Sequence, residues 1–133
     1  MIKEFHIQTP GQDAFIDITD RVEKIIGASS VKSGVCAVFV PHTTAGVTIN
    51  ENADPSVRRD IIKTLEKAIP NNAYYEHSEG NLPAHIKASL MGSSAIVFIQ
   101  NGSLSLGAWQ GIYFCEFDGP RRRKVMIKVI SDK

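Results

Sequence analysis

The sequence predicts an α+β fold, with an antiparallel or mixed sheet and helices packed on it. Short apolar runs typical of strands recur along the whole chain, segments with helical spacing interrupt them, and strand-like segments follow one another closely at the C-terminal end. The chain has 133 residues, 43% hydrophobic and 22% charged, which suits a single domain over 1–133 with a core of its own.

The strand-like segments differ in how they would be buried. Residues 2–9 and 121–131 alternate between polar and apolar, whereas 34–40 and 94–100 are almost wholly apolar, as expected of strands covered on both faces. We also expect strands over 15–19 and 44–50, and one or two strands over 103–119. Asn101 and Gly102 predict a turn, and we expect hairpins in this C-terminal part.

Three helices are predicted, each with its own start or stop signal. The helix over 20–30 would be capped by Thr19 or Asp20, and Gly27 weakens its end. The helix over 55–69 begins with Asp54 as N-cap and Pro55 at the first position, and Pro70 ends it. The helix over 83–92 begins at a proline and ends at a glycine.

Composition excludes several classes of protein. The net charge of +1 gives no reason to expect nucleic-acid binding, and the longest apolar run, 34–40, is too short to span a membrane. The first nine residues alternate and lack the apolar core of a signal peptide. Cys36 and Cys115 lie in apolar strands and read as buried thiols, so we expect a reduced cytoplasmic location.

The first polar cluster lies in "PHTTAGVTINENADPS", residues 41–56. His42, Thr43 and Thr44 precede a strand, and Asn50 and Glu51 end it. A turn with local side-chain hydrogen bonds explains much of the polar end, and helix initiation explains the aspartate at 54. His42 and Glu51 have no such structural reason, so they are candidates for a functional site.

The second cluster, "HSEGNLPAHIKAS", contains two further histidines. His77 and His85 flank Asn81 and lie eight residues apart, not the four of a helical zinc pair. His85 and Ser89 share one polar face of the helix. A surface histidine is the ordinary alternative. If the fold brings them together, His42, His77 and His85 make a three-histidine metal site with an open position, and His6 stays structural.

The third and fourth clusters are "LGAWQG" and "CEFDGPRRRKV". In the third, Trp109 offers a flat apolar surface and Gln110 an amide, although a bulge with a core tryptophan explains the pattern equally well. In the fourth, Glu116 and Asp118 alternate with apolar residues, so both acids would lie on one strand face. Three arginines follow a Gly-Pro turn. Arg121 and Arg123 are expected to point together and Arg122 oppositely. The fourth cluster is either a solvated charged turn or a clamp for phosphate or carboxylate.

These four motifs, in this order, resemble the YjbQ family over about residues 5–130. Members of that family are commonly described as secondary thiamine-phosphate synthases or as uncharacterised. The resemblance implies a compact domain with β-sandwich-like sheets carrying two or three helices, assembled as a homotrimer. It also implies that His42, His77 and His85 lie close together and hold a divalent metal, zinc or alternatively magnesium. Ala108 stands where the family motif has threonine, which removes one hydroxyl.

The activity that this resemblance implies joins an aminopyrimidine-methyl diphosphate to a thiazole phosphate with loss of pyrophosphate. Two alternatives stay open: zinc-assisted hydrolysis of a small phosphorylated or acylated metabolite, and metabolite binding without turnover by a trimer. The candidate catalytic residues are Glu51, Asp118, Gln110 and Arg121. The candidate substrate-binding residues are Thr43, Thr44, Asn50, Asn81, Ser89, Trp109, Glu116 and Arg122. We expect no nucleic-acid and no membrane partner.

Overall fold

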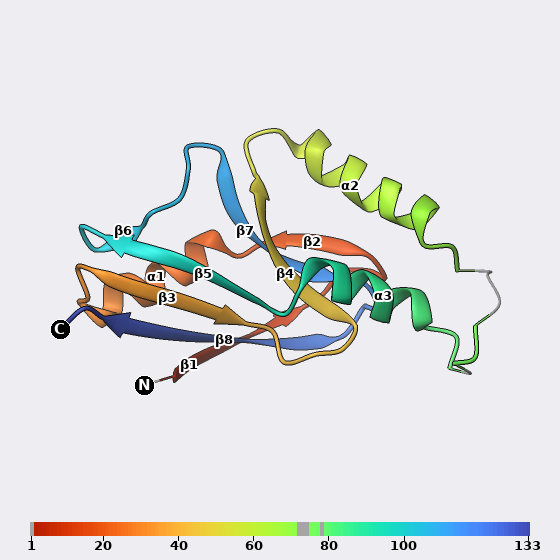
Figure 1. The fold of residues 1–133 in the computed structure, drawn as a ribbon, viewed down its shortest axis with the longest axis horizontal. Helices are drawn as coiled ribbons and strands as arrows, with labels where there is room; N and C mark the ends of the chain where they lie inside the picture. Colours follow the sequence, from red (N-terminus) through yellow and green to blue (C-terminus); the bar gives the residue numbers. More distant parts are fainter. Residues whose placement is uncertain (1, 72–74, 78) are drawn as a thin grey trace.

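The structure, a computed structural model, describes residues 2–71, 75–77 and 79–133. Over these residues the chain forms eight strands and three helices, as the sequence predicts for an α+β protein (Figure 1). The strands are β1 (Ile2–Gln8), β2 (Ala14–Asp17), β3 (Gly34–Phe39), β4 (Ala45–Glu51), β5 (Ser94–Gln100), β6 (Ser103–Leu104), β7 (Gln110–Glu116) and β8 (Arg122–Ser131). The helices are α1 (Thr19–Ser29), α2 (Pro55–Ala68) and α3 (Leu82–Met91).

Within the described residues the strands form two antiparallel sheets. The five-stranded sheet has the order β1-β8-β3-β5-β6, and the three-stranded sheet has the order β2-β7-β4. The register of β4 against β7 matters most for the site. Ala45 lies opposite Glu116 at one end of this pair, and Glu51 lies opposite Gln110 at the other.

The main core lies between the two sheets. Val38, Val97 and Ile127 of the five-stranded sheet pack in one cluster with Val47 and Phe114 of the three-stranded sheet. Two buried residues of α1, four apart in the chain, join the same cluster. This arrangement is the β-sandwich-like core that was expected, and it buries the apolar side of each sheet.

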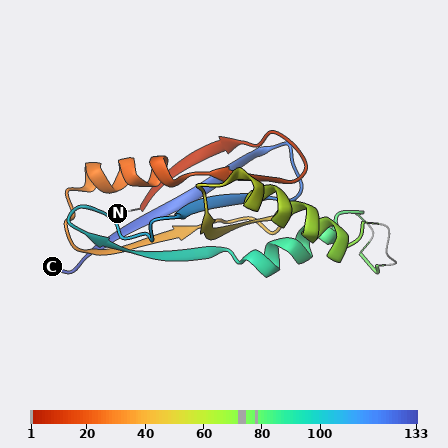
Figure 2. The same cartoon turned by 90° about the horizontal axis from the view of Figure 1, so that it is seen from above.

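A second, smaller core covers the other face of the three-stranded sheet. Phe15, Tyr113 and Phe117 pack there against Ala84 and Ala88 of α3, with partly buried side chains of α2 at the margin. Figure 2 shows α1 at one end of the molecule and α2 and α3 at the other. The helices therefore pack against different cores: α1 packs against the main core, and α2 and α3 pack against the smaller one.

The predicted N-cap is confirmed for one helix and wrong for another. Asp54 caps α2 as predicted, since its carboxylate accepts a hydrogen bond from Ser56 N–H at 2.9 Å. For α1 the expected cap is wrong, because neither Thr19 nor Asp20 caps it and the N-cap is Ile18, without a side-chain hydrogen bond. The carboxylate of Asp17 stabilises the start of the helix instead. It accepts hydrogen bonds from the backbone N–H of Thr19 at 2.9 Å and from the Thr19 hydroxyl at 2.6 Å.

Only one of the C-terminal hairpins forms as expected. β5 and β6 pair across Asn101 and Gly102, both with positive φ. β7 and β8 are consecutive in the chain but belong to different sheets. The chain crosses between the sheets at 117–121, and this crossing brings polar side chains to one end of the molecule.

Over the described residues no helix covers the outer face of the five-stranded sheet, and large apolar side chains are exposed on it. Phe39 of β3, Ile96 and Phe98 of β5, and Ile130 of β8 are large exposed side chains. The register aligns them, since Ile96 lies opposite Ala37 and Phe98 opposite Val35, which in turn lies opposite Ile130. No helix among the described residues is long and apolar enough to cross a membrane.

Candidate functional site

A hollow of about 480 Å³ lies where the segment before β4 meets α3. His42 and Thr43 line it on the β4 side, and His85, Ser89 and Ser93 line it on the α3 side. We call this hollow the histidine pocket. It brings His42 and Thr43 of the first polar cluster together with His85 and Ser89 of the second, so two of the three candidate histidines line it.

The N-cap of α3 and two polar residues of the helix lie along one line. Asn81, His85 and Ser89 are four residues apart in turn, so they lie on the same side of the helix. The ring of His77 packs edge-on against the ring of His85, with 5.3 Å between centroids. Among the described residues, the buried Nδ1 of His77 has no hydrogen-bond partner. His77 therefore brings an unused nitrogen donor next to the pocket.

His42 is held in place by the neighbouring sheet. Its Nε2 accepts a hydrogen bond from the backbone N–H of Lys124 at 2.9 Å. Burial, and next the positive charge of Arg123, lower the pKa of His42 below its ordinary value of 6.5. The imidazole is therefore neutral at pH 7, and because its Nε2 accepts this hydrogen bond, Nδ1 carries the proton and is a hydrogen-bond donor. Neutral imidazole is the form that binds metals, and His42 could bind one through Nε2 only by giving up the hydrogen bond from Lys124.

The close approach of α3 to β4 depends on Gly46. A Cβ at this position would lie 2.5 Å from the carbonyl oxygen of Gly92, at the end of α3. The N–H of Val47 donates to that same carbonyl at 3.0 Å. Strand and helix are thus in backbone contact, and this contact sets the width of the histidine pocket.

The turn after β7 adds a carboxylate and a guanidinium to the same end of the molecule. The amide nitrogen of Asn81 donates to Asp118 Oδ2 at 2.9 Å, and Arg121 Nη2 donates to the same oxygen at 3.1 Å. Arg121 Nε also donates to the Asp118 carbonyl at 2.8 Å. Asp118 is therefore linked through Asn81 to the helix that carries His85.

A buried ion pair forms the frame behind this turn. Arg123 Nε donates to Glu116 Oε1 at 2.8 Å, and Arg123 Nη2 donates to Glu116 Oε2. Glu116 also accepts from the Thr9 hydroxyl and from the backbone N–H of Phe117 and Asp118. Arg123 Nη2 reaches the Thr44 hydroxyl at 2.8 Å. Because Glu116 and Thr44 are buried with their polar groups in use, we assign them a positioning role.

The expected orientation of the arginines is wrong. Arg121 and Arg123 do not point together, because Arg121 lies before β8 and is exposed, whereas Arg123 is 4% exposed. Arg122 opens β8 and is exposed as well. The strand alternation that predicted the pairing begins only at residue 122. Of the three consecutive arginines, Arg121 and Arg122 are thus the two that can reach a ligand.

The remaining candidates lie at the opposite end of β4 and β7. Glu51 pairs with Gln110 in the register, and Asn50 and Trp109 are their chain neighbours. Seven residues of strand separate this end from Ala45, a span of about 20 Å. Within one chain the structure therefore does not bring Glu51, Asn50, Trp109 and Gln110 to the histidine pocket.

This second group has local roles of its own. Gln110 Oε1 accepts from Gly107 N–H at 2.8 Å and so closes the loop that holds Trp109. Trp109 is 67% exposed, which rules out the core position that was the alternative interpretation. Asn50 Oδ1 accepts from the N–H of Glu51 at 2.7 Å, although both residues belong to β4 and not to the turn that was expected.

Two charged residues in the core were missed by the sequence interpretation. Lys87 of α3 is buried, and its Nζ donates to Asp13 at 2.7 Å. Its position between the small residues Ala84 and Ala88 on the helix was the available signal. The second is Arg123, whose partner Glu116 is 7 positions away and lies in the other sheet. The alternating pattern of a strand gives no sign of such a partner.

The residues present fit a metal by donor type more than by arrangement. Imidazole nitrogens suit zinc and similar ions, and the buried His77 Nδ1 has no hydrogen-bond partner among the described residues. In the described part of the chain, however, no group of three or more His, Cys, Asp or Glu side chains is close enough to hold one ion. His77 contacts His85, and His85 shares the pocket with His42.

Comparison with known proteins identifies the family. The sequence profile described as UPF0047 protein YjbQ-like matches residues 3–132. The chain belongs to the YjbQ/UPF0047 family. This YjbQ-family protein is 51% identical to a UPF0047 protein of Methanocaldococcus jannaschii, over all of this chain and 96% of that protein. It is 47% identical to the UPF0047 protein YugU of Bacillus subtilis, over 98% of this chain and 100% of that protein.

Solved structures of YjbQ-family proteins share the fold. An uncharacterised family member from Clostridium acetobutylicum is 58% identical, with a TM-score of 0.94 over 96% of this chain and 99% of that one. A protein of unknown function from Sulfolobus solfataricus reaches the same TM-score of 0.94 at 30% identity, over 99% and 97% of the two chains. The two-sheet architecture is therefore a property of the family and not of this sequence alone.

Proposed function

We propose that this protein is a metal-assisted enzyme that acts on a small phosphorylated metabolite in the histidine pocket. One observation carries the proposal: His42 and His85 line the same pocket, and His77 packs against His85 with a buried nitrogen that lacks a partner among the described residues. A buried polar atom without a partner is costly, so a ligand for it is the simplest explanation.

Zinc is the ion that we propose for this site. The three candidate ligands are imidazoles, and the lowered pKa of His42 keeps that ring neutral at pH 7, so that its Nε2 could bind the ion in exchange for the hydrogen bond from Lys124. Magnesium prefers oxygen ligands and is the weaker alternative. When bound, a divalent ion supplies positive charge that polarises a phosphate or carbonyl oxygen of the substrate.

The chain itself supplies charge and hydrogen bonds beside the pocket. Arg121 and Arg122 are exposed guanidinium groups at the turn after β7 and suit the oxygens of a phosphate. Asp118 is the carboxylate that Asn81 and Arg121 orient, which makes it the candidate for moving a proton. Thr43 and Ser89 line the pocket and offer hydroxyl contacts.

The specific reaction to test first is the one that the family resemblance implies. Transfer of an aminopyrimidine-methyl group from its diphosphate to a thiazole phosphate releases pyrophosphate, whose negative charge Arg121 and Arg122 would stabilise. Trp109 would stack on a heterocycle, and Glu51 would hydrogen-bond it. Because those two residues lie at the other end of β4, this reaction requires their contribution from a neighbouring subunit.

A homotrimer, the assembly that the resemblance implies, is therefore part of the proposal. The exposed apolar face of the five-stranded sheet supports it, because Phe39, Ile96, Phe98 and Ile130 would otherwise stay in water. Antiparallel sheets usually present a polar face to solvent. We also propose a cytoplasmic location, which the two free, buried cysteines Cys36 and Cys115 support.

Hydrolysis of a small phosphorylated or acylated metabolite is the second candidate. Three nitrogen ligands leave a coordination position open, as in catalytic zinc sites. The placement of residues favours Asp118 over Glu51 as the general base, because Asp118 is linked to α3 whereas Glu51 lies at the far end of β4. This reaction needs no residue from the far end of the strand.

The experiment compares zinc-loaded and chelator-treated protein in two assays, thiamine phosphate formation and a hydrolase screen with small phosphate esters and acyl esters. A known thiamine-phosphate synthase serves as positive control for the first assay. We expect turnover that is lost on chelation and in His85→Ala, and kept in His6→Ala, which changes an exposed histidine of β1. Turnover that is indifferent to both chelation and His85→Ala would overturn the proposal, and ligand retention without turnover would leave a binding protein.

A further inference from the structure

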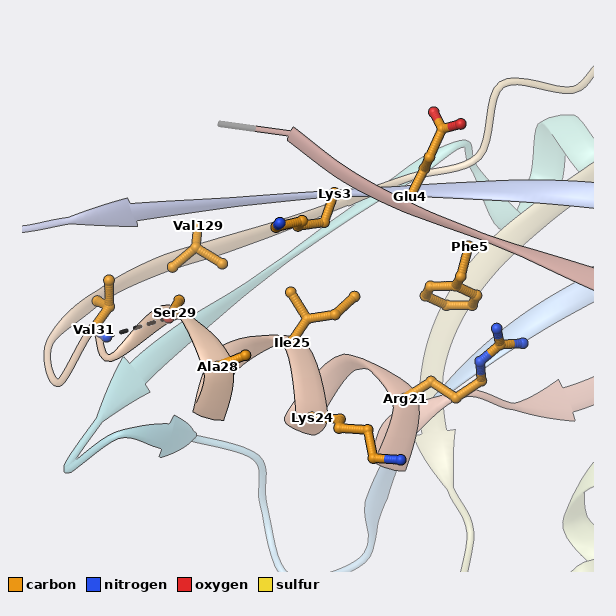
Figure 3. Close-up of a pocket in the computed structure, with 10 residues that line it drawn as sticks. All are labelled: Lys3, Glu4, Phe5, Arg21, Lys24, Ile25, Ala28, Ser29, Val31 and Val129. Carbon is orange, nitrogen blue, oxygen red and sulfur yellow. Dashed lines mark hydrogen bonds between the residues drawn. The ribbon is translucent and has the colours of Figure 1, made fainter.

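A second hollow, of about 800 Å³, lies between β1 and α1, on elements that line no part of the histidine pocket (Figure 3). Phe5 of β1 and Val129 of β8 line it on the sheet side. Ile25 and Ala28 of α1, and Val31 after it, line the helix side. We call it the β1–α1 hollow. Its volume is within the range of small-molecule sites.

The sequence explains why this hollow has an apolar floor. Lys3 and Phe5 are two apart in a strand, so both side chains lie on the face that turns towards α1. Arg21, Ile25 and Ala28 follow at spacings of four and three, so they share one face of α1. Phe5 and Ile25 are only partly buried and pack against the edge of the main core. An apolar surface is thus left open between the strand and the helix.

The rim of the hollow is positively charged. Lys3, Arg21 and Lys24 line it, against a single acid, Glu4. Figure 3 shows the Glu4 carboxylate pointing away from α1, and its oxygen lies 3.9 Å from Lys124 Nζ. Among the described residues, neither Lys3 nor Lys24 makes a side-chain hydrogen bond or an ion pair. The chain as a whole is almost neutral at +1, so this concentration of positive charge is local.

Arg21 is the one cation of the rim that is held in place. Its guanidinium lies 4.1 Å from the centroid of the Phe5 ring, and Nη1 donates to the carbonyl of His6 at 2.9 Å. In the part of the chain that the structure describes, the remaining N–H groups of this guanidinium make no hydrogen bond and are available to an acceptor. A fixed guanidinium over an apolar floor is the arrangement that orients a carboxylate.

We propose that the β1–α1 hollow binds a small amphipathic carboxylate of the aliphatic acid class. The apolar body lies against Ile25, Ala28 and Val129, and the carboxylate lies beside Arg21, with Lys3 and Lys24 adding positive charge at the rim. Charge complementarity selects this ligand. An uncharged apolar compound would form no ion pair with the three cations of the rim, and a small inorganic anion would not cover the apolar floor. The site is independent of the metal-assisted activity proposed for the histidine pocket.

The test is calorimetric titration of the full chain with decanoate, decanol and butyrate. Decanol keeps the apolar body without the charge, and butyrate keeps the charge with a short body. We expect saturable binding of decanoate at one site, weakened by added salt, and binding of decanol and butyrate at least about tenfold weaker. Lys24→Glu and Ala28→Glu should each weaken decanoate binding about tenfold, since each places an anion at the rim.

The matched control is Lys63→Glu, which makes the same charge reversal on the exposed side of α2 and should leave decanoate binding unchanged. Thermal unfolding of each variant shows that the fold is kept. Absence of decanoate binding, equal binding of decanol, or equal binding by Lys24→Glu and Lys63→Glu would each overturn the proposal. So would dissociation of an oligomer by Ala28→Glu, because a second copy of the chain would then occupy the hollow.

Discussion

Arg122 and Arg123 are neighbours in the chain but have opposite environments. Arg122 is exposed at the start of β8, whereas Arg123 is buried and forms two hydrogen bonds to Glu116. Through Glu116 and Thr44, Arg123 holds both the segment after His42 and the turn that carries Asp118. The geometry of the histidine pocket thus depends on a residue that does not line it.

Replacing each of these two arginines should distinguish the effect of the buried ion pair on stability from the effect of an exposed charge. Arg123→Met leaves the carboxylate of Glu116 buried without a cation, which should lower the free energy of unfolding by about 3–5 kcal/mol. Arg122→Met should change it by less than about 0.5 kcal/mol. Urea denaturation followed by circular dichroism measures both values. Equal effects of the two substitutions would contradict the buried ion pair.

The protonation of His42 gives a second prediction at this scale. Burial and the charge of Arg123 lower its pKa in the folded protein, so the unfolded state binds the proton more tightly. The contribution of His42 to stability is therefore fully present above its unfolded pKa, and it is lost as the pH falls from there through the folded pKa. NMR titration of the metal-free protein should place the His42 pKa below its ordinary 6.5. Titration at or above that value would contradict the environment described.

At the scale of the element, the contact between β4 and α3 determines the site. The strand supplies the segment with His42, the helix supplies His85, and Gly46 lets their backbones meet. α3 ends at Gly92, whose φ of 91° is in the region that favours glycine. Two glycines in different motifs are therefore needed for one contact.

Alanine substitution at two glycines tests this contact. Gly46→Ala places a Cβ 2.5 Å from a backbone carbonyl, so the end of α3 must move, at a cost of about 1–3 kcal/mol in unfolding free energy. Gly27→Ala in α1 meets nothing within 4 Å and should stabilise the protein by about 0.5–1 kcal/mol. Urea denaturation of both variants gives the comparison. Stabilisation by Gly46→Ala would show that the close approach is not tight.

Much of the element structure could be predicted from the sequence, because the signals are local. The Asp54–Pro55 start of α2 and the turn at Asn101 and Gly102 depend on residues next to one another. The α1 start was missed because Asp17 acts from the preceding strand, two residues before the helix residue that it caps. Local patterns also could not show that β7 and β8 belong to different sheets.

The types of residue in the candidate site could be predicted, but which of those residues lie close together could not. His42 and His85 meet in one pocket, as the histidine pattern suggested, but Glu51 and His42 flank the same strand at opposite ends. The stretch 41–56 is short in sequence, yet an extended strand separates its two polar ends by about 20 Å. Only the fold could show that Asp118 approaches α3 through Asn81.

At the scale of the whole molecule, the two sheets have different outer surfaces. α2 and α3 cover the three-stranded sheet, whereas the described residues provide no helix for the outer face of the five-stranded sheet. The homotrimer that we propose would cover this apolar face, and for the transferase activity it would have to bring the residues near Trp109 within reach of another copy. The proposed transferase activity depends on this assembly, and the proposed hydrolase activity does not.

Placing a charge on this face tests the assembly. Phe98→Glu puts a carboxylate in the middle of the exposed apolar residues and should convert a trimer into monomers. Thr64→Glu adds the same charge on the exposed side of α2 and should leave the trimer intact. Sedimentation velocity measures the mass of both variants and of the unchanged protein. A monomeric unchanged protein, or a trimer that persists in Phe98→Glu, would contradict the proposed interface.

The central claim is that His42, His77 and His85 hold one metal ion. Anomalous X-ray scattering from crystals of the zinc-loaded protein, recorded on both sides of the zinc absorption edge, tests it most directly. We predict a single strong peak with all three imidazoles around it, at zinc–nitrogen distances of about 2.0–2.1 Å. A peak bound elsewhere, or no peak beside His77 and His85, would contradict the claim.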